Sequence, residues 1–191
     1  MILTRIKCFK SLSKSRIRLP THLTAFESGT LQVVKVASRG DRCSTRSWLS
    51  LARVMGHVEA GSVSVQGTLQ AHSTVNVSDV FAGSGCFTVA ETLRAATVDF
   101  LLDSRSQCRV DSMTTTGDIV FAKSRPGAGR LVARRVAAGG DVRLVATEAA
   151  VVRGRRVLIG PDCNIGVVEY LESCDVAPGS VVGEAKQVAA L

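Results

Sequence analysis

Aromatic side chains are scarce in this chain of 191 residues and make up only 4% of it. Proline occurs only 4 times, and no apolar stretch approaches the ~20 residues that a membrane-spanning helix requires. Leucine and long runs of strong helix formers, on which helical bundles depend, are not prominent either. These absences argue against a helical bundle and against a membrane-spanning helix, and they leave small branched side chains to fill the core.

Motifs of the common enzyme classes are also missing. The sequence has no GxSxG, HExxH or GxGxxG motif and no phosphate-binding P-loop. Its three histidines, His22, His57 and His72, lie in the first part of the chain, and its aspartates fall singly in turn-like segments. The six cysteines form no CxxC motif and no zinc spacing with histidine, a pattern typical of reduced thiols in a cytosolic protein. We therefore expect a cytoplasmic protein with no catalytic residue, no cofactor and no metal.

The positive charge is concentrated at one end of the chain. The net charge is +8, and residues 1–21 hold six basic side chains and no acidic one. The other residues hold 18 basic and 16 acidic side chains, so the body of the protein is nearly balanced. Because the body shows no basic stripe interleaved with aromatics, we expect no nucleic-acid partner.

Residues 1–29 form a separate basic tail. Apolar residues fall near helical spacing in it, and basic residues flank them; the apolar set is Ile2, Leu3, Ile6, Phe9 and Leu12, and the basic set is Arg5, Lys7 and Lys10. Such a segment can lie at a membrane surface, with its basic side chains near anionic headgroups on the inner face of the cell membrane. A disordered, solvated arm is one alternative, and residues that are not made because translation begins later are another; the sequence leaves all three open.

Residues 30–191 differ from the tail in composition and in the pattern of their apolar residues. They are rich in valine, which occurs 27 times in the chain, and in glycine, which occurs 17 times. Apolar pairs two residues apart recur, as in Val63 and Val65, and a Gly, Asp or Ser turn follows within a few positions. Period-two alternation predicts strands, here of about three to five residues, that bury one side.

These short strands are joined by neither hairpin turns nor long crossover helices. That combination predicts an all-β fold, a β-solenoid of parallel strands with roughly 19 residues per coil and about eight coils. The segments "AETLRAATVDFLL" (90–102) and "GRLVARRVAA" (129–138) would suit helices by propensity, but their place inside the repeat favours strands. The segment "SRPGAGR" (124–130) is the clearest loop.

The stretch "IGPDCNIGVVEY" (159–170) has Ile-Gly steps six residues apart. We expect Ile159 and Ile165 to face inward, together with Cys163 and with Val167 or Val168. Gly160 and Gly166 would lie at corners where a Cβ would crowd the neighbouring coil. Similar six-residue steps occur in hexapeptide acyltransferases, in which a histidine acts as general base. Here the pattern lasts only about four steps and lies far along the sequence from every histidine.

The body resembles a known family. "VMGHVEAGSVSVQGTLQA" (54–71) and above all "AAVVRGRRVLIGPDCNIGVVEYLESCDVAPGSVVGEAKQV" (149–188) resemble the bactofilins, polymer-forming bacterial cytoskeletal proteins, and in particular their longer Bacillus-type members. The resemblance implies a right-handed parallel β-helix that polymerises without nucleotide. It also implies a scaffold that positions proteins of the envelope, of cell shape or of motility.

A solenoid of this kind exposes unpaired backbone groups and its apolar column at both ends unless a cap covers them. No capping helix is evident in the sequence, so we predict a homopolymer joined end to end. The interface candidates at one end are Leu31, Val33, Val34 and Val36, and those at the other end are Val176, Val181, Val182 and Val188. The partners expected are copies of the same chain and a protein cargo that the sequence does not identify. A hexapeptide-type transferase and a monomeric β-helical binding module are the alternatives.

Overall fold

The computed structural model describes residues 31–32, 51–54, 57–103, 107–125, 127 and 129–190, except for the side chains of residues 31–32, 51–54 and 66. The described residues form fourteen strands and no helix, and so contain no helix suited to cross a membrane. The strands are β1 (Leu31–Gln32), β2 (Leu51–Val54), β3 (Val58–Ala60), β4 (Val63–Ala71), β5 (Val75–Val77), β6 (Val80–Ala95), β7 (Thr97–Leu102), β8 (Cys108–Thr115), β9 (Ile119–Lys123), β10 (Leu131–Ala138), β11 (Val142–Leu144), β12 (Thr147–Ile159), β13 (Asn164–Val176) and β14 (Val181–Gln187).

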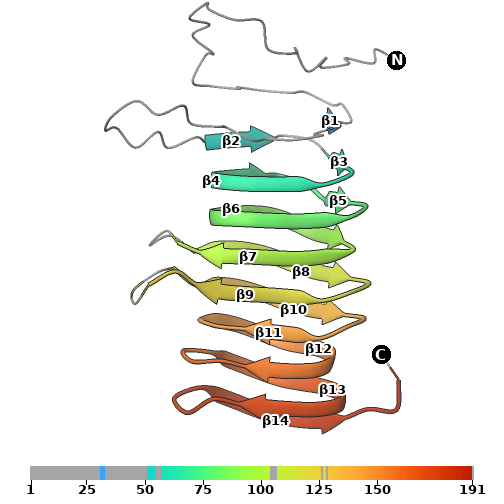
Figure 1. The fold of residues 1–191 in the computed structure, drawn as a ribbon, viewed down its shortest axis with the longest axis vertical. Helices are drawn as coiled ribbons and strands as arrows, with labels where there is room; N and C mark the ends of the chain where they lie inside the picture. Colours follow the sequence, from blue (N-terminus) through green and yellow to red (C-terminus); the bar gives the residue numbers. More distant parts are fainter. Residues whose placement is uncertain are drawn as a thin grey trace, which may run out of the picture.

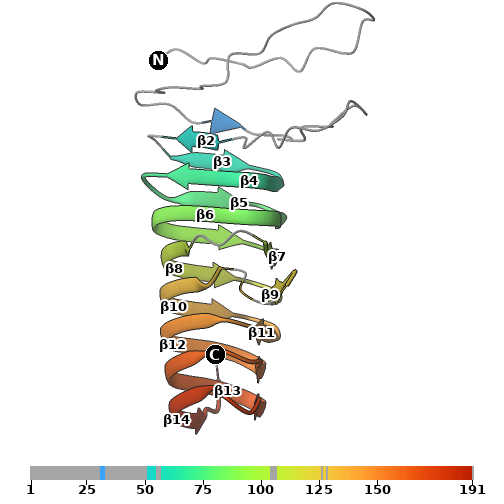
Figure 2. The same cartoon turned by 90° about the vertical axis from the view of Figure 1, so that its left-hand side faces the viewer.

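Every strand pair in the described chain is parallel, as in the ladders that join β8 to β10, β10 to β12 and β12 to β13. The coils stack along one axis into a β-solenoid of about seven turns, which two perpendicular views show as a column of ribbons (Figures 1 and 2). The predicted all-β solenoid is therefore confirmed. Its right-handed sense stays a prediction that rests on the resemblance.

The length of a coil follows from the register of the ladders. Val58 pairs with Val75, 17 residues later, whereas Ile119 pairs with Val142, 23 residues later. The longer coil contains the predicted loop 124–130, which connects β9 to β10. Coil length thus varies around the predicted value of roughly 19 residues, because the corners insert different numbers of residues, and the solenoid has about seven coils where about eight were predicted.

Buried side chains commonly come in pairs on three sides of a coil. In the coil that begins with β10, the inward residues are Leu131 and Ala133, Val136 and Ala138, and Val142 and Leu144. Two consecutive outward residues, Arg134 and Arg135, separate the first pair from the second. The backbone keeps its ladder hydrogen bonds around that corner, which is why β12 and β13 each reach 13 residues. The predicted strand length of three to five residues therefore holds for β2, β3, β5, β9 and β11 and is too short for the strands that continue around a corner.

The two segments with helical propensity are strands, as predicted. Residues 90–102 belong to β6 and β7, and residues 129–138 contain β10. In β10 the burial alternates with period two on either side of the corner. Burial of a valine-rich face against the neighbouring coils overrides the helical preference of alanine and arginine in these segments.

The stretch 159–170 contributes buried side chains to the apolar core, as predicted. Ile159, Cys163 and Ile165 are buried. Val168 is fully buried and Val167 only partly, which resolves the alternative between them. The six-residue rhythm therefore reflects the spacing of inward side chains in a coil.

The glycines of this stretch lie against the preceding coil. A Cβ on Gly166 would lie 2.6 Å from the carbonyl oxygen of Ala150, and one on Gly160 would lie 2.8 Å from Cγ2 of Val145. Both distances are too short for a side chain, so glycine is required by the close approach of two coils. The crowding was predicted correctly, although Gly166 lies within β13.

Four phenylalanines of the body gather in one cluster. Phe81, Phe87, Phe100 and Phe121 are fully buried on consecutive coils. The ring centroids of Phe87 and Phe100 are 4.9 Å apart and meet edge to face, and Phe81 and Phe121 each lie 6.0 Å from Phe100. Phe100 therefore joins three neighbouring rings inside the column.

The substitution Phe100→Ala should lower the free energy of unfolding by about 3–5 kcal/mol, the usual cost of deleting a buried phenylalanine. Leu101→Ala, at the next position but facing outward, is the matched control and should cost clearly less. Urea unfolding followed by circular dichroism measures both. Equal losses for the two variants would contradict the assigned alternation of β7.

Candidate functional site

The last coil is the first candidate site, because the interface residues predicted near the C-terminus lie there. It is formed by the second half of β13 and by β14. In the described part of the chain, β14 pairs with β13 and with no other strand. The outward edge of β14 therefore carries unpaired backbone N–H and C=O groups.

Two apolar columns end on this coil. Val182 pairs with Ile165, and Val176 pairs with Ile159. Val182 is half-buried and packs against the core, whereas Val176 is 43% exposed. Both side chains would be buried if another coil followed, as the equivalent positions in earlier coils are.

The other two predicted residues at this end lie differently. Val181 is 62% exposed and pairs with Asn164, at an outward register position. Val188 is half-buried, and its amide donates to the carbonyl of Tyr170 at 2.9 Å. Whether any of these residues forms an interface stays a prediction.

Sequence reasoning missed two members of the end layer. Cys174 pairs with the buried Val157, and Ala185 pairs with the buried Val168. Cys174 could have been found, because it lies two residues before Val176 on the same alternation. Ala185 could not have been found, because the corner after Val182 interrupts the period-two alternation of inward residues.

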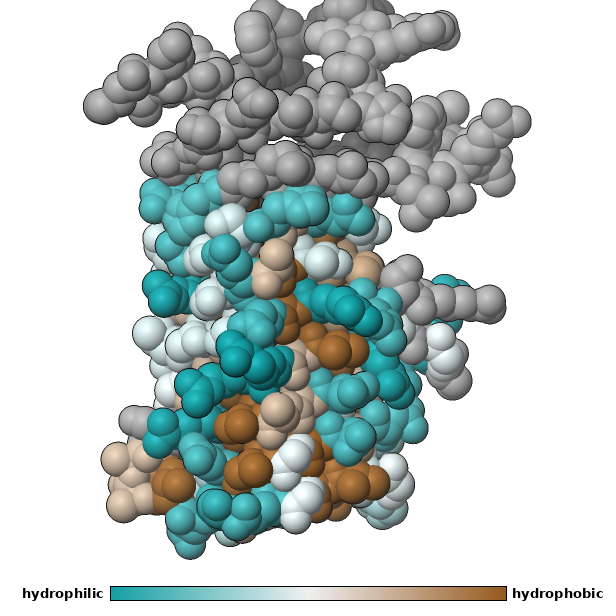
Figure 3. Space-filling view, turned by 180° about the vertical axis from the view of Figure 1, so that it is seen from behind, coloured by the Kyte–Doolittle hydropathy of each residue, from teal (hydrophilic) through white to brown (hydrophobic). Residues whose placement is uncertain are grey.

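The described residues after β14 leave the end coil uncovered. The carbonyl oxygen of Ala190 accepts a hydrogen bond of 2.8 Å from Nη2 of Arg153, which belongs to β12. Figure 1 accordingly shows the C-terminus beside the column rather than beneath β14. The view from behind shows hydrophobic side chains in a stripe that widens toward this end (Figure 3).

The predicted residues at the other end are placed only in part. Leu31 lies in β1 and pairs with Val58, and nothing is described of its side chain. Val33, Val34 and Val36 lie outside the described residues, as does the basic tail 1–29 with all its candidate membrane-binding residues.

A ladder of charged side chains joins the last three coils at one corner. Asp141 accepts hydrogen bonds from Arg156 and, at 3.1 Å, from Nε of Arg155. Glu172 lies 3.9 Å from Nε of each of these two arginines. The hydrogen bond from Arg156, followed by that from Arg155, holds the pKa of Asp141 below its ordinary value. This ladder fixes the corner and leaves no carboxylate free for acid–base chemistry within it.

The histidines lie apart from the six-residue steps. Nε2 of His57 lies 3.1 Å from Nδ2 of Asn76 and 3.4 Å from Glu59, and His72 is exposed. Both belong to the early coils, whereas the steps at 159–183 form the last coils (Figure 1). Among the described residues, no histidine stands beside the segment that resembles hexapeptide acyltransferases.

The buried thiols pack as small apolar groups. Cys86, Cys108 and Cys163 are buried and form no disulfide. The pKa of Cys108 is raised by its hydrogen bond with Cys86 and by burial, and burial raises the pKa of Cys163. Thiols held in the neutral form are poor nucleophiles. Within the described ranges, no three His, Cys, Asp or Glu side chains lie close enough together to hold a metal.

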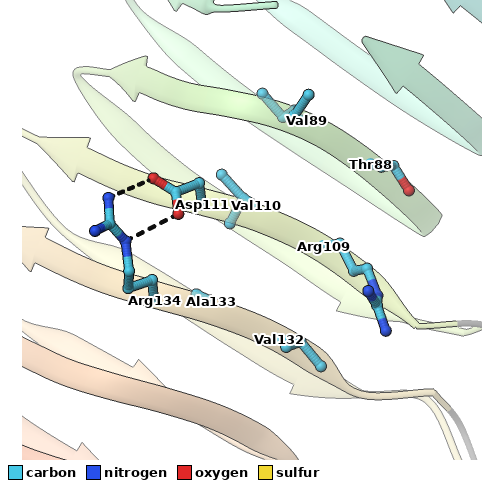
Figure 4. A pocket seen from close by; sticks show the side chains of 9 residues that line it. Thr88, Val89, Arg109, Val110, Asp111, Val132, Ala133 and Arg134 are labelled. Atoms are coloured by element: carbon cyan, nitrogen blue, oxygen red, sulfur yellow. Dashed lines mark hydrogen bonds and ion pairs between the residues drawn. The ribbon is translucent and has the colours of Figure 1, made fainter. Parts of the chain in front are cut away.

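A shallow hollow of about 280 Å³ lies over the first corner of β6, β8 and β10 (Figure 4). Nε and Nη2 of Arg134 donate to the two carboxylate oxygens of Asp111 at 2.9 and 2.8 Å. The remaining wall consists of Thr88, Val89, Ala90, Arg109, Val110, Val132 and Ala133. Because its acid and one of its two arginines satisfy each other, the hollow holds no nucleophile paired with a base.

The comparisons with known proteins identify a short similarity. Residues of this chain are 50% identical over 56 positions to the uncharacterized protein YhbF of Bacillus subtilis (strain 168). The match covers 29% of this chain and 23% of YhbF, so the chain spans about a quarter of the relative that it matches. No protein-family model and no solved structure matches the chain. The bactofilin resemblance is compatible with the solenoid, and the match covers too little of either chain to show a family.

The substitution Asp141→Asn should lower the free energy of unfolding at pH 7 by about 1 kcal/mol or less, the range for exposed ion pairs. The folded-state pKa of Asp141 lies below the unfolded value of ~3.9, so its contribution is present above that pH and lost as the pH falls through the folded pKa. Urea unfolding at pH 7 and pH 3 should show a difference from the native sequence that shrinks in acid. Asp175→Asn, which removes an exposed acid without an ion pair in the described chain, is the control, and an equal effect there would refute a specific role for the charged side chains around Asp141.

Proposed function

We propose that this protein is a non-enzymatic scaffold that assembles end to end into filaments without nucleotide, as its resemblance to the bactofilins implies. The uncovered last coil is the observation that carries the proposal. Val176 and Val182 extend two buried columns to a surface with no further strand among the described residues. A second copy could continue both the backbone ladder and the columns.

The energetics favour such a joint. Full burial of a valine side chain stabilises by about 1.5–3 kcal/mol relative to leaving it exposed. Val176 and Val182 are each only partly buried, so a joint would gain a fraction of that for each. The unpaired groups of β14 would gain partners at the same time, and an unpaired strand edge is a template for another chain. Valine burial and backbone hydrogen bonding both stabilise the joint only if the joining coil lies in register.

The cellular role in this proposal is to position other proteins of the envelope, of cell shape or of motility. No nucleotide, metal or cofactor takes part, and the cargo would bind along the sides of the filament. The protein would act in the cytoplasm, and the basic tail would hold filaments at the inner face of the membrane. The resemblance supports these statements, and YhbF of Bacillus subtilis, being uncharacterized, adds no role to them.

The substitution Val182→Arg should stop filament growth. It puts a charge in a joint that excludes water, and burying an unpaired charge costs several kcal/mol. Negative-stain electron microscopy without nucleotide should show filaments for the native chain and short particles for the variant. Thr114→Arg, at an exposed position of β8 away from the ends, is the matched control and should form filaments.

The outcomes of that experiment separate the alternatives. Long filaments of Val182→Arg would refute the end-on joint. A native chain that stays dispersed at every concentration would favour the monomeric binding module instead. Circular dichroism of the variant should match the native spectrum, because the substitution lies at the end of the column.

Removal of the basic tail should abolish binding to anionic vesicles. The full chain should sediment with vesicles that contain phosphatidylserine, and less so in high salt, because each basic residue contributes about 1 kcal/mol near an anionic surface. A chain that starts at Gly29 should stay in the supernatant. Equal sedimentation of the two would rule out the membrane role of the tail.

A further inference from the structure

One outward column of side chains crosses the coils with alternating character. Asp99, Val120, Arg143, Leu158 and Asp175 occupy consecutive coils and pair in register from β7 through β9, β11 and β12 to β13. Their neighbours along each strand are mostly buried, so these five point away from the core. The column therefore reads acid, apolar, base, apolar, acid along the solenoid axis.

The charged members of this column have no partner of their own. Within the described chain, Asp99, Arg143 and Asp175 take part in no ion pair or hydrogen bond of their side chains, whereas most other arginines nearby do. Asp99 and Arg143 are exposed, and Leu158 is 40% exposed. Charges that are unpaired and regularly spaced are available to a partner.

A second, more apolar column runs beside the first. Leu101 follows Asp99 by two residues and is 37% exposed, and Ala122 pairs with it on the next coil. Val145 follows Arg143 by two residues in the same way and lies against Gly160 of the coil after it. The strands β7 and β9, which begin this face, lie one above the other in Figure 1. The two columns together form a face with a charged edge and an apolar edge, which we call the ladder face.

We propose that the ladder face binds the ladder face of a second copy of this chain, with the two solenoid axes antiparallel and Val120 at the twofold axis. In a twofold contact, the residue one step above the axis meets the residue one step below it in the partner. Asp99 of each copy then lies opposite Arg143 of the other. Leu101 of each copy lies opposite Val145 of the other, and Ala122 faces its equivalent.

The charge pattern decides the direction. Two parallel copies in register would place Arg143 on Arg143 and Asp99 on Asp99, and like charges in contact are unfavourable. Antiparallel copies centred on Val120 form two complementary pairs. Coils are spaced by ~4.8 Å, so Asp99 and Arg143 are ~10 Å apart along the axis and both pairs form at once.

The ladder face offers a second centre at Leu158, where Arg143 would pair with Asp175. That arrangement overlaps only the last coils and leaves Leu101 uncovered. The centre at Val120 overlaps the column from Ser64 of β4 to Asp175 of β13, and it includes Leu101. The contact centred on Val120 is therefore the larger and the more apolar of the two.

The contact centred on Val120 carries one unfavourable feature. Asp118 lies two residues before Val120 at the margin of the face, and its two copies approach each other there. Oδ1 of Asp118 accepts a hydrogen bond of 2.8 Å from the amide of Asp141, which holds it in place. Asp118→Asn keeps that acceptor and removes the repulsion, so it should strengthen the contact.

The test uses sedimentation velocity of the full chain carrying Val182→Arg, so that end-on growth does not obscure the lateral contact. This chain should form a dimer that weakens with salt. Arg143→Asp alone or Asp99→Arg alone should weaken dimerisation at least tenfold, because each creates two like-charge pairs. The double variant Asp99→Arg/Arg143→Asp should restore it, and Asp118→Asn should tighten it.

Asp175→Arg is the control variant, and several results would overturn the proposal. Asp175→Arg should leave the dimer unchanged, since Asp175 of each copy faces the uncharged Ser64 of the other and forms no charged pair there. Loss of the dimer in Asp175→Arg with no effect of Asp99→Arg would overturn the Val120 centre in favour of Leu158. A monomer at all concentrations, or a double variant that stays monomeric, would overturn the proposal. Because the end-on joint is blocked throughout, these results are independent of whether filaments form.

Discussion

Backbone pairing between successive coils is the interaction on which the rest of this structure depends. Each strand of the solenoid finishes its hydrogen bonding only through the coil before it and the coil after it. The ladder continues around corners, which keeps side chains in register from coil to coil and turns inward positions into columns. The same rule that orders the interior leaves an unsatisfied edge wherever the coils stop. Backbone pairing between coils is thus the common cause of the ordered interior and of the tendency of the end coil to associate with another chain.

Burial of apolar side chains and exposed ion pairs differ greatly in how much they stabilise this fold. Burial of a phenylalanine such as Phe100 is worth several kcal/mol, whereas an exposed ion pair contributes about 1 kcal/mol or less. The arginine–carboxylate ladders at the corners therefore adjust stability, and the columns provide it. Charges matter more for association, because their spacing on a regular surface decides which direction of a second copy is allowed.

Much of the fold was predictable because the solenoid imposes simple local rules. Period-two alternation located the strands, and it located them even in 129–138, where propensity favours a helix. The inward residues Ile159, Cys163 and Ile165 followed from the same rule. Strand length was not predictable, because hydrogen bonding continues through corners such as Arg134–Arg135 that look like interruptions in the sequence. The number of coils was not predictable for a related reason, since loops such as 124–130 lengthen single coils without adding any.

The end layer was only partly predictable. Val176 and Val182 extend buried columns, while Val181 faces outward and Ala185 takes a place that the sequence did not indicate. The ladder face was not predictable from the sequence, since Asp99 and Arg143 are far apart in it and share a column only through the register of β7, β9 and β11. Amide hydrogen exchange of β14 tests the central claim most directly. In assembled protein, the amides of Val181–Gln187 that point away from β13 should become protected relative to dispersed protein. Exchange of these amides at the same rate in both states would contradict an end-on joint.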